Sequence, residues 1–172
     1  MILTVCGIPG SGKSTVAKLL ARHLKAPLVA WDEYETMTQR SPDEIAAWLA
    51  RGAPFSEIEA PGLVERLRGA GELTVFDSLL GPTWPPCFDL KLSSIWLECP
   101  ADIALARKVS QLLAQVGPEW ITGYLAAYPK TVAPALAFQK TRVPQLCDLT
   151  LDATMKPQSS VDSALRHFLY ND

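Results

Sequence analysis

The sequence predicts an α/β fold, with a parallel sheet that is covered by helices on both faces. Short apolar runs alternate with segments of helical periodicity along the chain, which is typical of a parallel sheet with crossover helices. The apolar runs are continuous, so both faces of each strand are expected to be buried. Between the first run and the first helix lies an octet, Gly7 to Ser14, that reads G-I-P-G-S-G-K-S and fits the phosphate-binding pattern G-x-x-x-x-G-K-[ST].

The individual elements follow from local pattern. The first strand is the apolar run 2–6, and the helix after it, 13–25, places Val16 and Leu20 on one face. The second helix begins at Ser41-Pro42-Asp43-Glu44, where Pro takes the first helical position and Glu the third. The remaining elements are strands at 27–31, 73–76, 94–97 and 149–151, and helices at 42–51, 61–70, 101–116, 118–140 with breaks, and 159–169.

The residue types of the octet suit the phosphates of a nucleoside triphosphate. Its glycines let backbone N–H groups curl around phosphate oxygens, while Lys13 reaches the terminal phosphates and the Ser14 hydroxyl binds Mg²⁺. The phosphates then lie on a helix N-terminus, which favours anions. A chance glycine turn is the alternative, but the strand and helix that the motif requires are both predicted. The expected nucleotide-binding residues are Gly7, Pro9, Gly10, Ser11, Gly12, Lys13, Ser14 and Thr15.

Composition narrows the class of protein. With 172 residues, 48% hydrophobic and 20% charged, the chain is expected to form one domain over 1–172. A formal net charge of −2 and a pI near 5.7 disfavour a nucleic acid polymer as partner. No apolar run approaches the roughly 18 residues of a membrane span and no charged leader precedes the first strand, so we expect a cytoplasmic protein. Cys6, Cys87, Cys99 and Cys147 form no C-x-x-C pair and are interpreted as reduced core thiols, with a metal site as the minor alternative.

The octet resembles the loop of the P-loop kinases of small molecules, which include nucleoside and nucleotide kinases, uridine kinases and adenylylsulfate kinases. The Asn-Lys-x-Asp motif of GTPases is missing from the sequence. Residues 95–107 are similar to a motif of uridine kinases in which an apolar strand, a carboxylate and x-Pro precede a helix that ends in Ala-Arg. Residues 128–134 and 147–152 resemble motifs that follow later in the same kinases. The resemblance implies a three-layer P-loop NTPase fold, a five-stranded parallel sheet in the order 2-3-1-4-5, and ATP and Mg²⁺ as ligands. It also implies that the loop after 147–152 lies against the adenine ring.

Two aspartates follow predicted strands, where ligands collect in such sheets. Asp32, in W-D-E-Y-E, is similar to the D-D-[FY] of uridine kinases and is expected to accept or orient the proton of an acceptor hydroxyl. A helix cap is the alternative for this residue. Asp77 ends an apolar run in the manner of a Walker B carboxylate, so we expect it to hold Mg²⁺ or substrate. For Asp77 the alternative is a turn residue before Gly81.

Arg107 and Lys108 fall where the resemblance implies a lid over the transferred phosphoryl group, whose charge an arginine would stabilise. An exposed helix cation is the alternative for Arg107. Residues 109–120 contain no basic residue, unlike the arginine-rich lids of these kinases. Three cations could replace the missing charge if 118–140 folds over the site: Lys130, Lys140 and Arg142.

The acceptor cannot be identified from the sequence, although its charge can be addressed. Apart from Arg66 at its end, Arg40 and Arg51 are the only cations of the region 35–66, which makes an uncharged hydroxyl compound a better candidate than a nucleoside monophosphate. Trp48 falls at helical spacing and is expected in the core, whereas Trp84 in a proline-rich loop is a candidate substrate contact.

These observations predict an ATP-dependent, Mg²⁺-requiring kinase that acts on a small-molecule hydroxyl. The expected catalytic residues are Lys13, Asp32 and Arg107, and the expected metal ligands are Ser14 and Asp77. Two other functions fit the same motif, namely a nucleotide-binding regulator derived from a kinase, and a plain NTPase that acts with a protein partner. The oligomeric state is left open.

Overall fold

The computed structural model, which describes residues 1–170, contains a five-stranded parallel sheet in the order β2-β3-β1-β4-β5. Its central strands are paired so that Val5 lies opposite Asp77 on one side and Ile95 on the other. The predicted fold class and strand order are therefore confirmed. The strands are β1 (Ile2–Cys6), β2 (Leu28–Ala30), β3 (Thr74–Ser78), β4 (Leu92–Glu98) and β5 (Leu149–Asp152).

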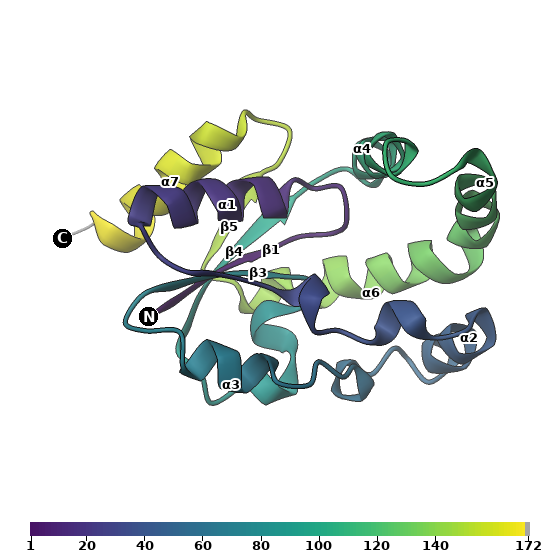
Figure 1. Cartoon of the computed structure of the whole chain (residues 1–172), viewed down its shortest axis with the longest axis horizontal. Helices are drawn as coiled ribbons and strands as arrows, with labels where there is room; N and C mark the ends of the chain where they lie inside the picture. Colours follow the sequence, from purple (N-terminus) through teal and green to yellow (C-terminus); the bar gives the residue numbers. More distant parts are fainter. Residues whose placement is uncertain (171–172) are drawn as a thin grey trace.

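Helices cover both faces of the sheet (Figure 1). α1 and α7 lie side by side on one face, and α3 lies on the other. α2, α4 and α5 lie beyond the carboxyl ends of the strands, and α6 runs from there back beneath the sheet. The helices are α1 (Lys13–Leu24), α2 (Pro42–Ala50), α3 (Leu63–Arg68), α4 (Ala101–Leu113), α5 (Pro118–Ala127), α6 (Ala133–Arg142) and α7 (Pro157–Leu169), with a π-helical turn at Tyr128–Val132 and 3₁₀ turns at Trp31–Glu33, Met37–Gln39, Phe55–Glu57, Gly81–Thr83, Pro85–Cys87 and Pro144–Leu146.

Local signals set several boundaries as expected. The Ser41 hydroxyl accepts a hydrogen bond from the Glu44 N–H, and the Glu44 carboxylate accepts one from the Ser41 N–H, which is the predicted start of α2. α7 begins at Pro157 and not at residue 159, because proline is favoured at the first helical position. The segment 118–140 is broken as predicted, by the π-helical turn between α5 and α6.

β3 is longer than predicted and includes Asp77, which therefore lies within the strand and not in a turn. The strand extends because Asp77 pairs with Val5 of β1 and with Ala30 of β2. The turn that follows is held by Ser78, whose hydroxyl accepts hydrogen bonds from the backbone of the next residues, Leu80 and Gly81. The turn is therefore stabilised by the side chain of Ser78 and not by that of Asp77.

Trp84 is a core residue, so the prediction that it contacts substrate is wrong. Its side chain is 3% exposed, and its indole N–H donates to the Ile58 carbonyl at 2.8 Å. The ring meets Trp31 edge to face, with centroids 4.9 Å apart. The core position predicted for Trp48 is confirmed, since it is buried and donates to the Pro54 carbonyl.

The cysteines are free thiols. Cys6, Cys87 and Cys99 are buried, as predicted, while Cys147 is half-buried. Burial raises the pKa of Cys87 to about 12, which keeps that thiol protonated. Among residues 1–170, no helix has the length and apolar character that crossing a bilayer would require.

We expect Trp84→Phe to destabilise the protein, because the Ile58 carbonyl loses its buried donor. The free energy of unfolding should fall by about 1–3 kcal/mol, as measured by denaturant unfolding. Trp120→Phe is the matched control, because Trp120 is 52% exposed and should change stability by less than about 0.5 kcal/mol. Equal effects of the two substitutions would contradict the core role of Trp84.

Candidate active site

The loop between β1 and α1 presents an open helix N-terminus at the carboxyl edge of the sheet. Gly12, with φ 92°, precedes α1, and the first turn of the helix has neither a side-chain cap nor an acidic residue. The backbone N–H of Ser11 is used within the loop, where it donates to the Ile8 carbonyl at 3.0 Å. The N–H groups at the start of α1 therefore form a site suited to an anion.

Gly10 allows α4 to pack directly on this loop. Its φ is +85°, and a Cβ at this position would overlap the backbone carbonyl of Ala104. Only glycine fits such a contact without strain. Because Ala104 is held against the loop, the next turn of α4 carries Arg107 and Lys108 to the same place, where both line a cavity with Lys13.

Lys13 and Asp77 form a buried, loosely spaced ion pair in the floor of the site. Both residues are 7% exposed, and Lys13 Nζ lies 4.0 Å from Asp77 Oδ1. Within the described residues, Oδ1 accepts no hydrogen bond. Burial raises the pKa of Asp77, an effect that the Lys13 ammonium and the Ser14 hydroxyl oppose and the Asp32 carboxylate reinforces. The carboxylate therefore lacks a partner that would balance its desolvation.

The carboxylate of Asp77 and the hydroxyl of Ser14 suit a divalent cation. Both are hard oxygen donors of the kind that Mg²⁺ prefers, and Ser14 lies close enough to Asp77 to lower its pKa. A cation at this point would also lie close to Oδ1, which accepts no hydrogen bond within the described residues and has Lys13 only at 4.0 Å. The residues present therefore fit the metal that the sequence implies.

A cavity of about 690 Å³ opens above this floor. Loop 7–15, α4, α5 and the segment after β2 all contribute to its wall. Its lining residues are Pro9, Gly10, Gly12, Lys13, Ser14, Thr15, Asp32, Glu35, Thr38, Leu79, Arg107, Lys108, Gln111, Leu112, Trp120, Tyr124 and Val132. The structure thus brings Asp32 and Arg107 to the same cavity as the phosphate-binding loop.

A second cavity of about 280 Å³ adjoins the first, because Gly12, Thr15 and Arg107 line both. On its far side lies the segment after β5, represented by Ala153 and Met155. The sequence resemblance implied that this segment lies near a nucleotide base. In the structure the segment and the phosphate-binding loop line the same 280 Å³ cavity.

Asp32 lies in the 3₁₀ turn that follows β2 and is exposed. No side chain caps that turn, so Asp32 is not the helix cap that was its alternative. Arg107 is also exposed along much of its length, but its Nη1 donates to the Ala153 carbonyl at 2.9 Å. This bond fixes the guanidinium between the two cavities, so Arg107 is not a free surface cation.

The cations that were expected to supplement the lid are engaged elsewhere. Lys140 Nζ lies 2.7 Å from Glu98 Oε1 and donates to the Cys99 carbonyl at 3.0 Å. Arg142 donates to the carbonyls of Gly52 and Ala53. Neither residue lines the 690 Å³ cavity, nor does the exposed Lys130. These three residues, which could have replaced the missing charge if 118–140 folded over the site, therefore do not do so in this structure.

Comparison with known proteins gives distant relatives among kinases. No protein-family model matches the chain. The chain is 25% identical to a cytidylate kinase of Methanococcoides burtonii over 114 residues, which are 64% of this chain and 63% of the relative. It is 36% and 39% identical to shikimate kinases of Corynebacterium glutamicum and Corynebacterium efficiens over 75 residues, which are 43% of this chain and 44% of each relative. The chain therefore spans less than two thirds of each relative's length.

Solved structures resemble the chain over nearly its whole length. A shikimate kinase of Acinetobacter baumannii in complex with shikimate superposes with a TM-score of 0.63 at 16% identity, covering 99% of this chain and 94% of that one. A shikimate kinase of Aquifex aeolicus gives 0.57 at 18% identity, with 99% and 98% covered. A gluconokinase of Sinorhizobium meliloti gives 0.53 at 17% identity, with 95% and 88% covered. The chain has the P-loop kinase fold. The finer resemblance to uridine kinases stays a prediction.

Two aromatic residues of this kinase fold's site were not found from the sequence. Trp120 and Tyr124 lie one turn apart on α5 and line the large cavity, with their rings stacked 5.6 Å apart at 11°. Tyr128 continues the series and meets Tyr124 edge to face. A spacing of four residues between aromatics was the available signal. It could not be interpreted because the same spacing occurs on helices that face a core.

Gln139 was missed as well, and it connects α6 to the phosphate-binding loop. Its side chain is 4% exposed, and Nε2 donates to the Leu79 carbonyl at 2.5 Å and to the Gly7 carbonyl at 3.3 Å. A buried amide that joins the first residue of the loop to the segment after β3 orders both of them. Nothing in the local sequence shows where the partners of this glutamine lie.

We expect Asp77→Asn to stabilise the ligand-free protein at neutral pH and to remove its stabilisation by Mg²⁺ and nucleotide. Because burial raises the pKa of Asp77 in the folded state, folding favours the neutral carboxyl. The stabilisation that comes from keeping Asp77 protonated is fully present at pH values below the pKa of this carboxyl in the unfolded chain. It is lost as pH rises through the higher pKa of the carboxyl in the folded protein. The gain from Asp77→Asn should therefore be largest at neutral pH and should vanish as pH falls into the ordinary carboxyl range.

Urea unfolding at several pH values measures this gain, with Asp89→Asn as the control at an exposed position. An Asp77→Asn protein that is less stable than the wild type at neutral pH would show that the Lys13 pairing outweighs desolvation.

Gln139→Leu should loosen the phosphate-binding loop, because the carbonyls of Gly7 and Leu79 lose their shared donor. We expect a loss of about 1–3 kcal/mol in the free energy of unfolding, together with weaker nucleotide binding by titration calorimetry. Gln145→Leu, at an exposed position, controls for the change of side chain. Unchanged nucleotide affinity in Gln139→Leu would contradict the role of this contact.

Proposed function

We propose that the protein is a kinase that transfers the terminal phosphoryl group of ATP to a hydroxyl group of a small molecule. The observation that carries the proposal is the 690 Å³ cavity, in which one wall is the phosphate-binding loop and another holds Asp32. Such a cavity accommodates a nucleotide's phosphates and a second small compound side by side. The distant relatives named as shikimate and cytidylate kinases support phosphoryl transfer as the reaction class.

The two adjoining cavities suggest how the nucleotide binds. In this proposal the base occupies the 280 Å³ cavity between Thr15 and Ala153, and the phosphates extend past Gly12 onto the start of α1. Backbone N–H groups of the loop and the Lys13 ammonium bind the phosphate oxygens. Arg107 lines both cavities and lies where it can hold the phosphate chain in place.

Ser14 and Asp77 would hold Mg²⁺, which when bound neutralises charge on the phosphates. This assignment is supported by the buried Asp77 Oδ1, which accepts no hydrogen bond within the described residues. Lys13 at 4.0 Å provides the carboxylate with partial compensation only. Mg²⁺ and nucleotide are therefore expected to stabilise the protein together.

Asp32 is assigned to the acceptor. Its carboxylate lines the cavity on the side opposite α4, and from there it can accept the proton of the attacking hydroxyl or orient that hydroxyl toward the phosphoryl group. Lys13, Arg107 and Lys108 carry the positive charge that stabilises the transferring group. Phosphoryl transfer depends mainly on such positioning and charge, and the cavity supplies both.

A nucleotide-binding regulator is the second candidate, and one observation favours it. Lys140 and Arg142 are bonded to backbone carbonyls away from the cavity, so Arg107 and Lys108 are the lid cations that line it within residues 1–170. A regulator would bind ATP without acceptor-dependent turnover. A plain NTPase would instead hydrolyse ATP at a rate that no acceptor changes.

The test is acceptor-dependent release of ADP from Mg²⁺-ATP across a library of small hydroxyl compounds. We expect Lys13→Ala to lower turnover by about 10²–10³-fold, because it removes positive charge from the phosphates. Asp32→Asn should lower turnover by about 10²–10⁴-fold and leave ATP affinity close to the wild-type value.

Lys91→Ala and Asp89→Asn are matched controls, since both residues are exposed and neither lines the cavity. Full turnover in Lys13→Ala would refute the assignment. ATP binding without acceptor-dependent turnover in the wild type would favour the regulator, and turnover that survives Asp32→Asn would favour the NTPase.

A further inference from the structure

Charge is distributed unevenly over the wall of the 690 Å³ cavity. The cations that line it, among the residues that the structure describes, are Lys13, Arg107 and Lys108, and they come from loop 7–15 and α4. We call the rest of the wall beyond the loop and α4 the acceptor side. It consists of Asp32, Glu35, Thr38, Leu79, Trp120, Tyr124 and Val132. The acceptor side therefore has two carboxylates and no positive charge.

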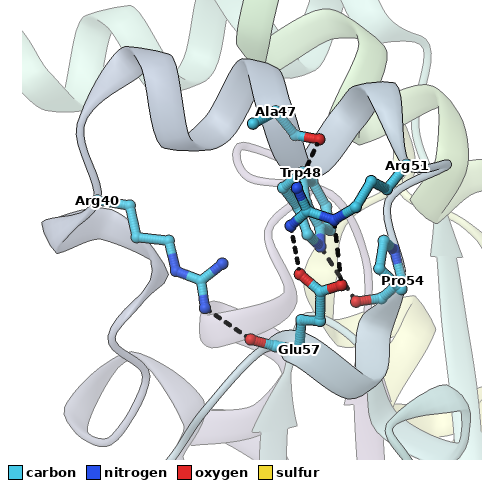
Figure 2. A network of polar contacts seen from close by, with 6 residues as sticks. All are labelled: Arg40, Ala47, Trp48, Arg51, Pro54 and Glu57. Atoms are coloured by element: carbon cyan, nitrogen blue, oxygen red, sulfur yellow. Dashed lines mark hydrogen bonds and ion pairs between the residues drawn. The ribbon is translucent and has the colours of Figure 1, made fainter.

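Arg40 and Arg51, the cations of the segment 35–66 apart from Arg66 at its end, both point to Glu57 (Figure 2). Arg51 forms an ion pair with the Glu57 carboxylate, with Nη2 at 2.6 Å from Oε2, and its Nη1 donates to the Ala47 carbonyl at 3.0 Å. Arg40 Nη2 donates to the backbone carbonyl of Glu57 at 2.6 Å. Each guanidinium is thus used to order the turn after α2, and neither lines the cavity.

Arg142 of α6 is also bound by other groups of the protein. Its two terminal nitrogens donate to the carbonyls of Ala53 and Gly52 at 2.8 and 2.7 Å. The guanidinium lies between the rings of Phe55 and Phe138, at 5.1 and 4.7 Å from their centroids. The carbonyls and both rings would have to release Arg142 before it could bind an acceptor group.

One of the two carboxylates of the acceptor side, that of Glu35, is held in place by hydrogen bonds. Glu35 accepts hydrogen bonds from the Thr38 hydroxyl at 2.8 Å and from the Thr38 N–H at 3.1 Å. Asp32 is exposed and lines the same side of the cavity. An anionic group on the acceptor would meet this negative potential and lose its hydration without gaining a cation. A neutral or positively charged group would not bear that cost.

The acceptor side also offers a flat apolar surface. The rings of Trp120 and Tyr124 line the cavity and stack on each other, so the ring that remains available to a ligand is that of Trp120, which is 52% exposed. Exposed aromatic rings at the wall of a cavity are suited to stack on a planar group of a ligand.

We infer that the acceptor is an alcohol without carboxylate or phosphate, neutral or cationic, which carries a flat ring that stacks on the exposed ring of Trp120. The inference rests on the proposed kinase function and names the substrate class of the same cavity. It sets the protein apart from the proteins named as shikimate kinase, gluconokinase and cytidylate kinase that it resembles, since shikimate, gluconate and cytidylate are anions.

The experiment compares paired alcohols that differ only in an anionic group. The pairs are cyclic or aromatic hydroxy acids, each compared with its methyl ester and with its aminomethyl analogue, so that the hydroxyl groups are the same in every member. Acceptor-dependent ADP release by the full chain is measured with Mg²⁺-ATP. We expect kcat/KM to be higher for the non-anionic member of each active pair by at least about tenfold.

Glu35→Gln tests the local origin of this preference, because it removes one charge from the acceptor side while keeping an oxygen that can accept from Thr38. The preference, which is kcat/KM for the non-anionic member divided by kcat/KM for the anionic member, should fall by about threefold or more. Glu33→Gln is the matched control, because Glu33 is exposed at the end of the preceding 3₁₀ turn, two residues from Glu35, and does not line the cavity. Arg51→Gln should leave the ratio unchanged.

The outcomes separate this inference from the proposed function. Turnover that is equal within pairs, or faster with the anionic members, would overturn the inference and leave the kinase function standing. A preferential loss of anionic acceptors in Arg51→Gln, or equal effects of Glu33→Gln and Glu35→Gln, would also overturn it. ATP binding with no turnover for any pair would refute the kinase function, and the inference would fall with it.

Discussion

The buried pair of Lys13 and Asp77 is the interaction on which the site is organised. Two charges at 7% exposure are costly to desolvate, and a separation of 4.0 Å returns only part of that cost. Asp77 Oδ1 accepts no hydrogen bond within residues 1–170, so its charge in the ligand-free site is balanced only in part by Lys13. A metal ion and an anion bound at this point would complete the balance, so ligand binding and folding stability are expected to be linked. Such incompleteness is typical of functional sites and would be hard to explain in a purely structural core.

α6 holds together the three segments that surround this pair. Over a single turn, Gln139 bonds the carbonyls of Gly7 and Leu79, and Lys140 bonds that of Cys99. Arg142 bonds the turn after α2 through Gly52 and Ala53. The polar side chains of this helix therefore fix the phosphate-binding loop, the start of α4 and the segment beyond α2 relative to each other. This role explains why α6 carries cations although it supplies none to the cavity.

Local patterns predicted the sheet, the loop and most helix positions, because strand apolarity and caps such as Ser41–Glu44 are short-range signals. The misjudged residues depend on distant partners. Trp84 is buried because the Ile58 carbonyl accepts its N–H, and Arg142 is engaged because Gly52 and Ala53 lie beside α6. Neither partner can be located from the sequence around these residues. The fold could therefore be predicted from the sequence. The partner of each charged side chain could not, because it depends on tertiary contacts.

A fold alone does not select a substrate. The contacts made by each charged residue therefore decide which acceptors a protein of this fold can bind. An arginine does not serve an anionic acceptor when it is held away from the acceptor side, as Arg142 is by its bonds to the Gly52 and Ala53 carbonyls and its position over two aromatic rings. Under the proposed function, the phosphate end of the cavity retains its cations and the acceptor side has aromatic rings and carboxylates instead. Stabilisation of the transferring phosphoryl group then depends on Lys13, Arg107 and Lys108, and recognition of the acceptor depends on stacking and hydrogen bonds. The two tasks are thereby assigned to different walls of one cavity.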